Sequence, residues 1–124
     1  EAKGYVPVIT GHSLGGGLGQ IFAARLGISA MVFSPVGISL IEGRLDIRNL
    51  GDLPVENTVT SVIPWGDIVP LLLDEHTSVT QYIQCNVVNP IWCHDLRRSA
   101  CEIYRKCGDP RGRDLDTYCS AHSE

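Results

Sequence analysis

Residues 5–16 have the sequence YVPVITGHSLGG. Their first half is apolar and rich in β-branched residues, which predicts a strand, and residues 16–26 predict a helix. The pentapeptide GHSLG lies between them, at 11–15. A strand, a G-x-S-x-G sequence and a helix in this order are typical of a sharp turn that exposes a nucleophilic serine. Ser13 is therefore the candidate nucleophile.

Three neighbours of this serine support a chemical role. Gly11 and Gly15 are expected to let the strand and the helix approach each other closely. The N–H of Leu14 is expected at the helix N-terminus, where it can face a developing oxyanion. The alternative is a glycine-rich turn with an incidental serine, which the flanking strand and helix disfavour.

Strands and helices alternate along the rest of the chain. Further strands are expected where apolar or β-branched residues run together, at 30–34, 59–63 and 79–84. Residues 35–57 are expected to be irregular, and a second helix is expected at 95–106. This alternation predicts an α/β fold class with a mostly parallel sheet flanked by helices.

The spacing of apolar residues predicts which face each helix buries. Gly27 is placed to end the first helix. The apolar positions of that helix, near a 3.6-residue period, are Leu18, Ile21, Phe22 and Leu26. Those of the second helix are Leu96, Ala100, Ile103 and Cys107.

Length and composition set limits on the protein class. The 124 residues make one domain or part of one, and the 44% hydrophobic content suits a packed core. The net charge of −4 and the lack of a basic stripe argue against nucleic acid as a partner. No apolar run is long enough for a transmembrane segment. Because a strand is expected almost at once, we expect a fragment: residues 1–107 from a folded domain and 108–124 as a polar, poorly ordered tail.

A nucleophilic serine needs a carboxylate that orients its base. In this architecture the acid follows a later strand, at the sheet edge where the serine lies. Asp67 fits, because it comes shortly after the strand expected at 59–63. Asp52 and Asp74 are alternatives that follow no strand directly, and Asp67 itself can be a simple turn carboxylate.

Four histidines compete for the role of base. His12 is expected to pack on the wrong side of the turn, and His122 lies in the tail. His76 comes only nine residues after the candidate acid. His94 lies in a loop at the start of the last helix, a common place for a triad base. Order and placement favour His94 and leave His76 open.

Several motifs together resemble a known family. The GHSLGG sequence at 11–16 resembles the nucleophile turn of class 3 (fungal-type) lipases, in the α/β-hydrolase superfamily. The sequence DIVP at 67–70 is similar to the D-x-V-P motif that carries the acid of that family, and CHDL at 93–96 matches the place of its base. The sequence FSPVG at 33–37 is similar to the SPPG stretch of the diacylglycerol-lipase branch, with Val36 in place of the second proline. The resemblance covers about residues 5–106.

The resemblance implies the C-terminal part of a catalytic domain, a partial α/β-hydrolase fold whose N-terminal strands are missing. The missing part would carry the lid and the second oxyanion donor. Loss of such a donor typically lowers the rate by about 10²–10³-fold. Activity is therefore expected in the full-length protein, and weak or no activity in this piece alone.

All five cysteines lie in the last third of the chain, at Cys85, Cys93, Cys101, Cys107 and Cys119. Their clustering predicts local disulfides around the candidate base. The preferred pairs are 85–93, which the resemblance also supports, and 101–107, with Cys119 left unpaired, although sequence alone does not fix connectivity. Disulfides favour secretion or a vacuolar or lysosomal lumen. The alternative is reduced thiols in a cytosolic, membrane-associated protein.

The expected activity is that of a serine ester hydrolase with Ser13, Asp67 and His94 as its triad and the N–H of Leu14 as an oxyanion donor. Such chemistry needs no metal or organic cofactor, and no C-x₂-C spacing indicates zinc. The resemblance implies a lipid substrate, an acylglycerol or phospholipid at a membrane or droplet surface. The alternatives are an acyltransferase with the same triad and a non-catalytic lipid-binding module.

Overall fold

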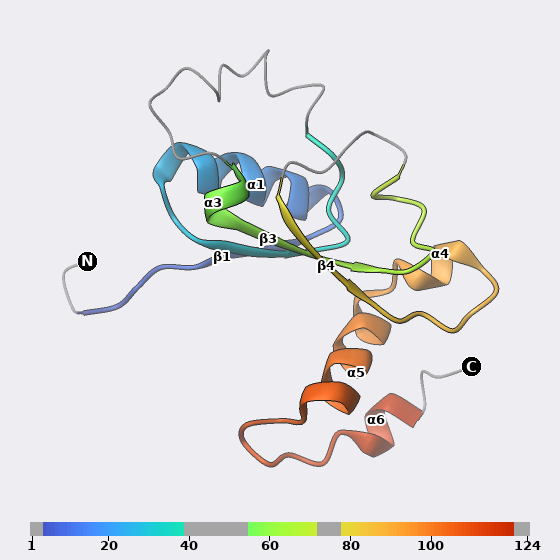
Figure 1. Cartoon of the computed structure of the whole chain (residues 1–124). Coiled ribbons are helices and arrows are strands. Elements are labelled where there is room, and N and C mark those ends of the chain that lie inside the picture. Colours follow the sequence, from blue (N-terminus) through green and yellow to red (C-terminus); the bar gives the residue numbers. More distant parts are fainter. Residues whose placement is uncertain (1–3, 39–54, 72–77, 121–124) are drawn as a thin grey trace.

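The computed structural model describes residues 4–38, 55–71 and 78–120 of the chain (Figure 1). Within these ranges four strands form one sheet, in which every pair of neighbours is parallel. The strands follow the order of the sequence, as β1 (Ile9–His12), β2 (Ala30–Phe33), β3 (Val59–Pro64) and β4 (Val79–Ile83). The α/β class and the parallel sheet expected from the sequence are thus confirmed.

Helices lie on both sides of this sheet. Helices α1 and α3 lie on one side of the sheet, whereas α5 projects on the other side from next to β4, and α6 lies against α5 (Figure 1). The helices are α1 (Leu14–Leu26), α3 (Val55–Thr58), α4 (Pro90–Cys93), α5 (Leu96–Cys107) and α6 (Asp116–Ser120). The short helices α3, α4 and α6 were not expected from the sequence, because each spans only four or five residues.

The register of the parallel strands brings their carboxyl ends to one edge of the sheet. His12 at the end of β1 is paired with Phe33 at the end of β2, and Phe33 is paired with Val62 of β3. Beyond the pairing, the N–H of Ser13 donates to the carbonyl of Phe33 at 3.1 Å. The segments that follow β1 and β3, which carry Ser13 and Asp67, therefore leave the sheet at the same edge.

The face that α1 turns to the sheet is not the expected one. Its buried residues are small or polar: Gly16, Gly17, Gly19, Gln20, Ala23 and Ala24. Of the four expected apolar positions, Leu18, Phe22 and Leu26 are exposed, whereas Ile21 is partly buried and packs against the core. Close packing explains the difference, because a Cβ atom at Gly17 would lie 2.5 Å from Cγ2 of Val36. The helix ends as expected at Gly27, which has a left-handed conformation and donates to the carbonyl of Ala23.

The buried face of α5 also differs from the expected one. Ser99 and Cys101 are buried, whereas Leu96, Ala100 and Cys107 are exposed and Ile103 is half-buried. The apolar spacing misidentified this face because a disulfide at Cys101, and not a row of aliphatic side chains, fastens the helix. The helix begins with Asp95 as its N-cap, whose side chain accepts the N–H of Arg97 at 2.9 Å.

Two disulfides hold the C-terminal third together. The expected pair Cys85–Cys93 is present. The expected pair of Cys101 with Cys107 is wrong: Cys101 is bonded to Cys119, and Cys107 is free and exposed. Cys101 and Cys107 both belong to α5, where six residues span about 9 Å, beyond the reach of a disulfide.

The polar segment after α5 has structure of its own as far as residue 120. The backbone N–H and the guanidinium of Arg113 both donate to the carboxylate of Asp109, at 2.8–3.0 Å. Helix α6 follows and is tied to α5 through the disulfide of Cys119. The first thirteen residues of the tail assigned to 108–124 are thus anchored to α5.

Candidate active site

Ser13 occupies the sharp turn between β1 and α1. Its backbone angles are φ 55° and ψ −124°, a strained conformation with a positive φ that non-glycine residues rarely adopt. Its carbonyl accepts the N–H groups of Gly17 at 3.1 Å and Val36 at 3.3 Å, which stabilises this backbone. The strained conformation is therefore held from both the helix and the segment after β2.

The turn requires Gly11 but not Gly15. A Cβ atom at Gly11 would overlap the backbone carbonyl of Gly15, whereas a Cβ atom at Gly15 would meet open space. The expectation that both glycines provide room is right for Gly11 and wrong for Gly15. The close approach is that of the α1 backbone over the end of β1.

The structure brings the three expected side chains into one hydrogen-bonded chain. Nε2 of His94 lies 2.8 Å from Oγ of Ser13. Nδ1 of His94 lies 3.1 Å from both carboxylate oxygens of Asp67. One tautomer satisfies both contacts: Nδ1–H donates to Asp67, and Nε2 accepts the hydroxyl proton of Ser13. The hydroxyl is thus aligned with a group that can take its proton.

Asp67 is held in place by the turn that follows β3. Its N–H donates to the carbonyl of Pro64 at 3.1 Å, and its Oδ1 accepts the N–H of Val69 at 3.0 Å. The carboxylate is fully buried, whereas 19% of the His94 side chain is exposed. A buried carboxylate is stable only with partners, and here the partners are His94 and Val69.

His94 lies between two helix ends. It is the C-cap of α4, where its N–H donates to the carbonyl of Ile91 at 3.1 Å. Before it, Cys93 is bonded to Cys85. After it, Asp95 caps α5. The candidate base is therefore fixed on both sides by elements of the C-terminal third.

The charge of Asp95 suits its place at the helix N-terminus. Partial burial works to raise the pKa of this carboxyl, but the N–H and the guanidinium of Arg97 outweigh it and lower the pKa. A carboxylate at this end also interacts favourably with the helix dipole. This cap therefore fixes the segment that carries His94.

The competing candidates fall into two groups. Asp52, Asp74, His76 and His122 lie outside the described residues. His12 lies within them, and its position was not foreseen. Its Nε2 is 2.9 Å from the carbonyl oxygen of His94, and the two rings are 4.6 Å apart between centroids, at 37°. The sequence carries no signal for this contact, which joins residues 82 positions apart.

Leu14 is the first residue of α1, as expected for an oxyanion donor. The first N–H groups of a helix have no acceptor within it, so the Leu14 N–H can serve a ligand. The side chain of Leu14 is exposed, as is that of Ile68 beside Asp67. The surroundings of the hydrogen-bonded chain thus include apolar surface.

Two further properties concern only the described part of the chain. No group of three or more histidine, cysteine or carboxylate side chains there could hold a metal ion. None of the helices found there has the length and apolar character needed to cross a membrane.

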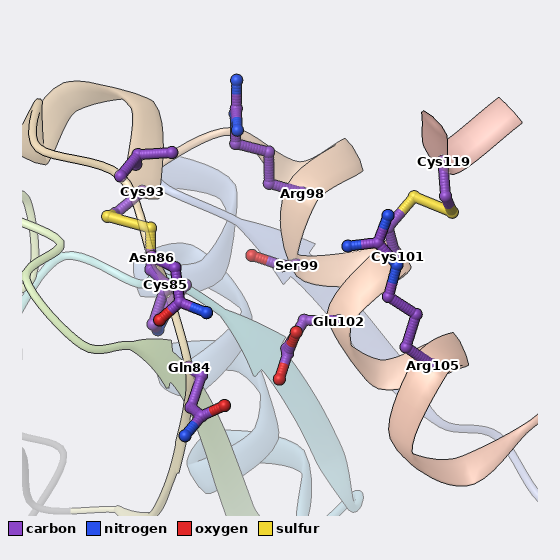
Figure 2. Close-up of a pocket in the computed structure, with 12 residues that line it drawn as sticks. Gln84, Cys85, Asn86, Cys93, Arg98, Ser99, Cys101, Glu102, Arg105 and Cys119 are labelled. Carbon is purple, nitrogen blue, oxygen red and sulfur yellow. A yellow bond between two sulfur atoms is a disulfide. The ribbon is translucent and has the colours of Figure 1, made fainter. Parts of the chain in front are cut away.

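A separate cavity of about 110 Å³ lies between the end of β4 and α5 (Figure 2). Both disulfides line it, and Ser99 and Glu102 of α5 face it together with Gln84 and Asn86 from beyond β4. Oε1 of Glu102 is buried and has no hydrogen-bond partner among the residues that the structure describes. Ser13, Asp67 and His94 do not line this cavity.

Comparison of the sequence with protein-family models finds no match, and neither does comparison with curated proteins. The interpretation of the site therefore depends on its own geometry. The site consists of a serine with a positive φ in a sharp turn, a histidine within hydrogen-bond distance of its hydroxyl, and a buried carboxylate that is hydrogen-bonded to the other ring nitrogen of the histidine.

Proposed function

We propose that this chain carries the nucleophile, base and acid of a serine ester hydrolase related to class 3 lipases of the α/β-hydrolase superfamily. Its substrates are acylglycerols or phospholipids. The observation that supports this most is the continuous hydrogen-bonded chain from Ser13 through His94 to the buried Asp67. Side chains from three distant segments meet in the order that serine hydrolysis needs.

The backbone of Ser13 provides a second line of support. Ser13 has a positive φ and lies between a parallel strand and a helix, as does the serine of a nucleophile turn. A purely structural serine at this position gains nothing from such strain. Strained backbone conformations concentrate at functional sites, where they place a reactive group.

The proposed reaction follows from the three roles. Oγ of Ser13 attacks the ester carbonyl while Nε2 of His94 takes the hydroxyl proton, and Asp67 stabilises the resulting imidazolium. The N–H of Leu14 donates to the oxyanion of the tetrahedral intermediate. The C–O bond to the alcohol then breaks, and His94 passes its proton to the leaving alkoxide. In the second step His94 takes a proton from water, which attacks the acyl-enzyme carbonyl. The bond from Oγ of Ser13 to the acyl group then breaks, His94 returns the proton to Oγ, and the carboxylic acid is released.

The apolar surface near the nucleophile favours an acyl substrate. Leu14 follows Ser13 directly, and Ile68 follows Asp67; both expose their side chains, as does Leu71 at the end of the same described segment. Exposed aliphatic groups beside a reactive hydroxyl suit an acyl chain or a lipid surface better than a polar ester.

The test combines covalent labelling with turnover. A fluorophosphonate reacts with an activated serine, so it should add one phosphonyl group at Ser13, located by mass spectrometry of peptides. Ser13→Ala should abolish the label and lower hydrolysis of short and long acyl esters by at least about 10³-fold. The matched control is Ser29→Ala, at an exposed serine outside the site, which should be labelled and should hydrolyse esters like the unmodified full-length protein.

The proposed family relation places a second oxyanion donor before residue 1, so the turnover assay uses the full-length protein. Equal turnover by the unmodified protein and Ser13→Ala would refute the proposal. Preferential transfer of the acyl group to an added alcohol would identify an acyltransferase. Lipid binding without labelling or turnover would identify a binding module.

A further inference from the structure

We propose that His12 is a positioning residue that holds His94 in line with Ser13. This inference rests on the proposed function, since it assigns His94 the role of base. Hydrolysis as described above uses only Ser13, His94, Asp67 and Leu14, and leaves His12 without a task. Within the described residues, the His12 side chain makes a hydrogen bond and a ring contact, and both are with His94.

The first contact fixes the main chain of His94. The acceptor is a carbonyl oxygen, so Nε2 of His12 must carry the proton and donate it, across 2.9 Å. His12 is the last residue of β1 and is paired with Phe33 in the sheet. The hydrogen bond therefore ties the segment between α4 and α5 to the rigid sheet.

The second contact fixes the ring of His94. The two imidazoles lie 4.6 Å apart between centroids, with an interplanar angle of 37°. The edges of the His94 ring are engaged by Ser13 at Nε2 and by Asp67 at Nδ1. The His12 ring limits the one remaining motion, a displacement of the imidazole out of its plane.

The position of His12 in the sequence makes this device effective. His12 is covalently next to Ser13, so the group that anchors the base belongs to the same strand end as the nucleophile. His94 itself belongs to a short helix end, outside the sheet. A displacement of about 1 Å between reacting groups can cost about 10²-fold in rate. The contact between His12 and His94 therefore fixes the position of His94 relative to Ser13.

Two substitutions separate the hydrogen bond from the ring contact. His12→Phe keeps a ring but removes the donor, whereas His12→Gln keeps an N–H near the place of Nε2 but removes the ring. We expect His12→Phe to lower kcat about 10- to 100-fold with little change in KM, and His12→Gln to restore most of that loss. The matched control is Thr10→Ala, at an exposed position on the same strand, which should leave kcat and KM unchanged.

A spectroscopic readout tests the same inference without any substrate. The Nδ1–H proton of His94, donated to Asp67, should give a downfield NMR resonance in the unmodified chain. In His12→Phe this resonance should shift or broaden through exchange with water, and in His12→Gln it should largely return. Thr10→Ala should leave the resonance in place.

The outcomes of the two readouts are distinguishable. Unchanged kcat together with an unchanged His94 resonance in His12→Phe would overturn the positioning role. Should His12→Phe fail to fold, a normal kcat and resonance in His12→Ala would overturn it equally. Absence of turnover in the unmodified full-length protein would refute the proposed function, while the resonance would still decide whether His12 positions His94.

Discussion

The turn after β1 and the segment around His94 place the two ends of one hydrogen bond by different means. The turn holds Ser13 through local backbone contacts: the α1 backbone lies directly over Gly11, and the Ser13 carbonyl accepts two N–H groups. The segment around His94 has no strand and only four residues of helix before it. A disulfide to Cys85 and the cap at Asp95 hold it instead.

The difference shows that the two parts should fail in different ways. The close contact at Gly11 leaves no room for an added atom, so a single methyl group there should displace Ser13. The disulfide and the helix cap each contribute independently to the free energy of unfolding. Removing one of them should therefore lower stability and the alignment of His94 only partly.

The largest effect is expected at Gly11. Gly11→Ala places a methyl group on the carbonyl of Gly15, and we expect a loss of about 3 kcal/mol in the free energy of unfolding. Gly15→Ala is the control, because its added methyl group meets open space at a helical position. It should leave stability unchanged or raise it by up to about 1 kcal/mol. Urea denaturation of both variants measures the contrast, and similar stabilities would show that the turn is not sterically constrained.

Paired removal of the disulfides comes next. Cys85→Ala with Cys93→Ala should cost about 2.5 kcal/mol, and Cys101→Ala with Cys119→Ala about 3 kcal/mol. The difference is small because the cost grows only with the logarithm of loop length, and the bonded cysteines are 8 and 18 positions apart. Only the first pair adjoins His94. We therefore expect ester turnover by folded protein to fall about tenfold in the first double variant and to stay unchanged in the second. Equal turnover in the two double variants would show that the bond between Cys85 and Cys93 does not help to align His94.

A smaller effect is expected at the cap of α5. Asp95→Ala removes the acceptor of the Arg97 N–H and should cost about 1 kcal/mol by thermal or urea unfolding, whereas Asp95→Asn should cost less. Because the pKa of Asp95 is lowered in the folded protein, the stabilisation from its charge is present above its ordinary pKa. That stabilisation is lost as the pH falls through the folded value. Asp95→Ala should thus lose less stability than the unmodified chain on acidification below about pH 4.

The smallest effect is expected on the outer face of α1. Phe22 is exposed, so Phe22→Gln should change the free energy of unfolding by less than about 0.5 kcal/mol. The control is Ala24→Leu, at a fully buried position, which should cost about 1–3 kcal/mol. A large loss in Phe22→Gln would show that this face is covered in solution.

The fold was predictable from sequence wherever the signal is local. Runs of β-branched residues and a helix bounded by Gly27 were sufficient to place the strands and α1. The faces of the helices were not predictable in this way, because the expected rule assumes that large apolar residues are buried. In α1 the buried face includes Gly16, Gly17 and Gly19, where the helix backbone lies so close to the strands and to the segment after β2 that an added Cβ atom would be crowded.

The candidate site was predictable to a similar extent. Ser13, Asp67 and His94 were identifiable because each follows or precedes an element with a clear pattern. The contact of His12 with His94 and the pairing of Cys101 with Cys119 were not. Both depend on how the C-terminal third folds back on the sheet, and residues 18 to 82 positions apart carry no mutual signal in a single sequence.

The strands lie in the sheet in the same order in which they are synthesised. We expect β1, α1 and β2 to associate while the last third of the chain is still being synthesised. At that stage Ser13 is an ordinary alcohol, since His94 arrives only after another sixty residues have followed β2. Under the proposed function, Ser13 is therefore activated only after His94 has been synthesised and has folded back onto the sheet, and the bond between Cys85 and Cys93 then improves the alignment of His94.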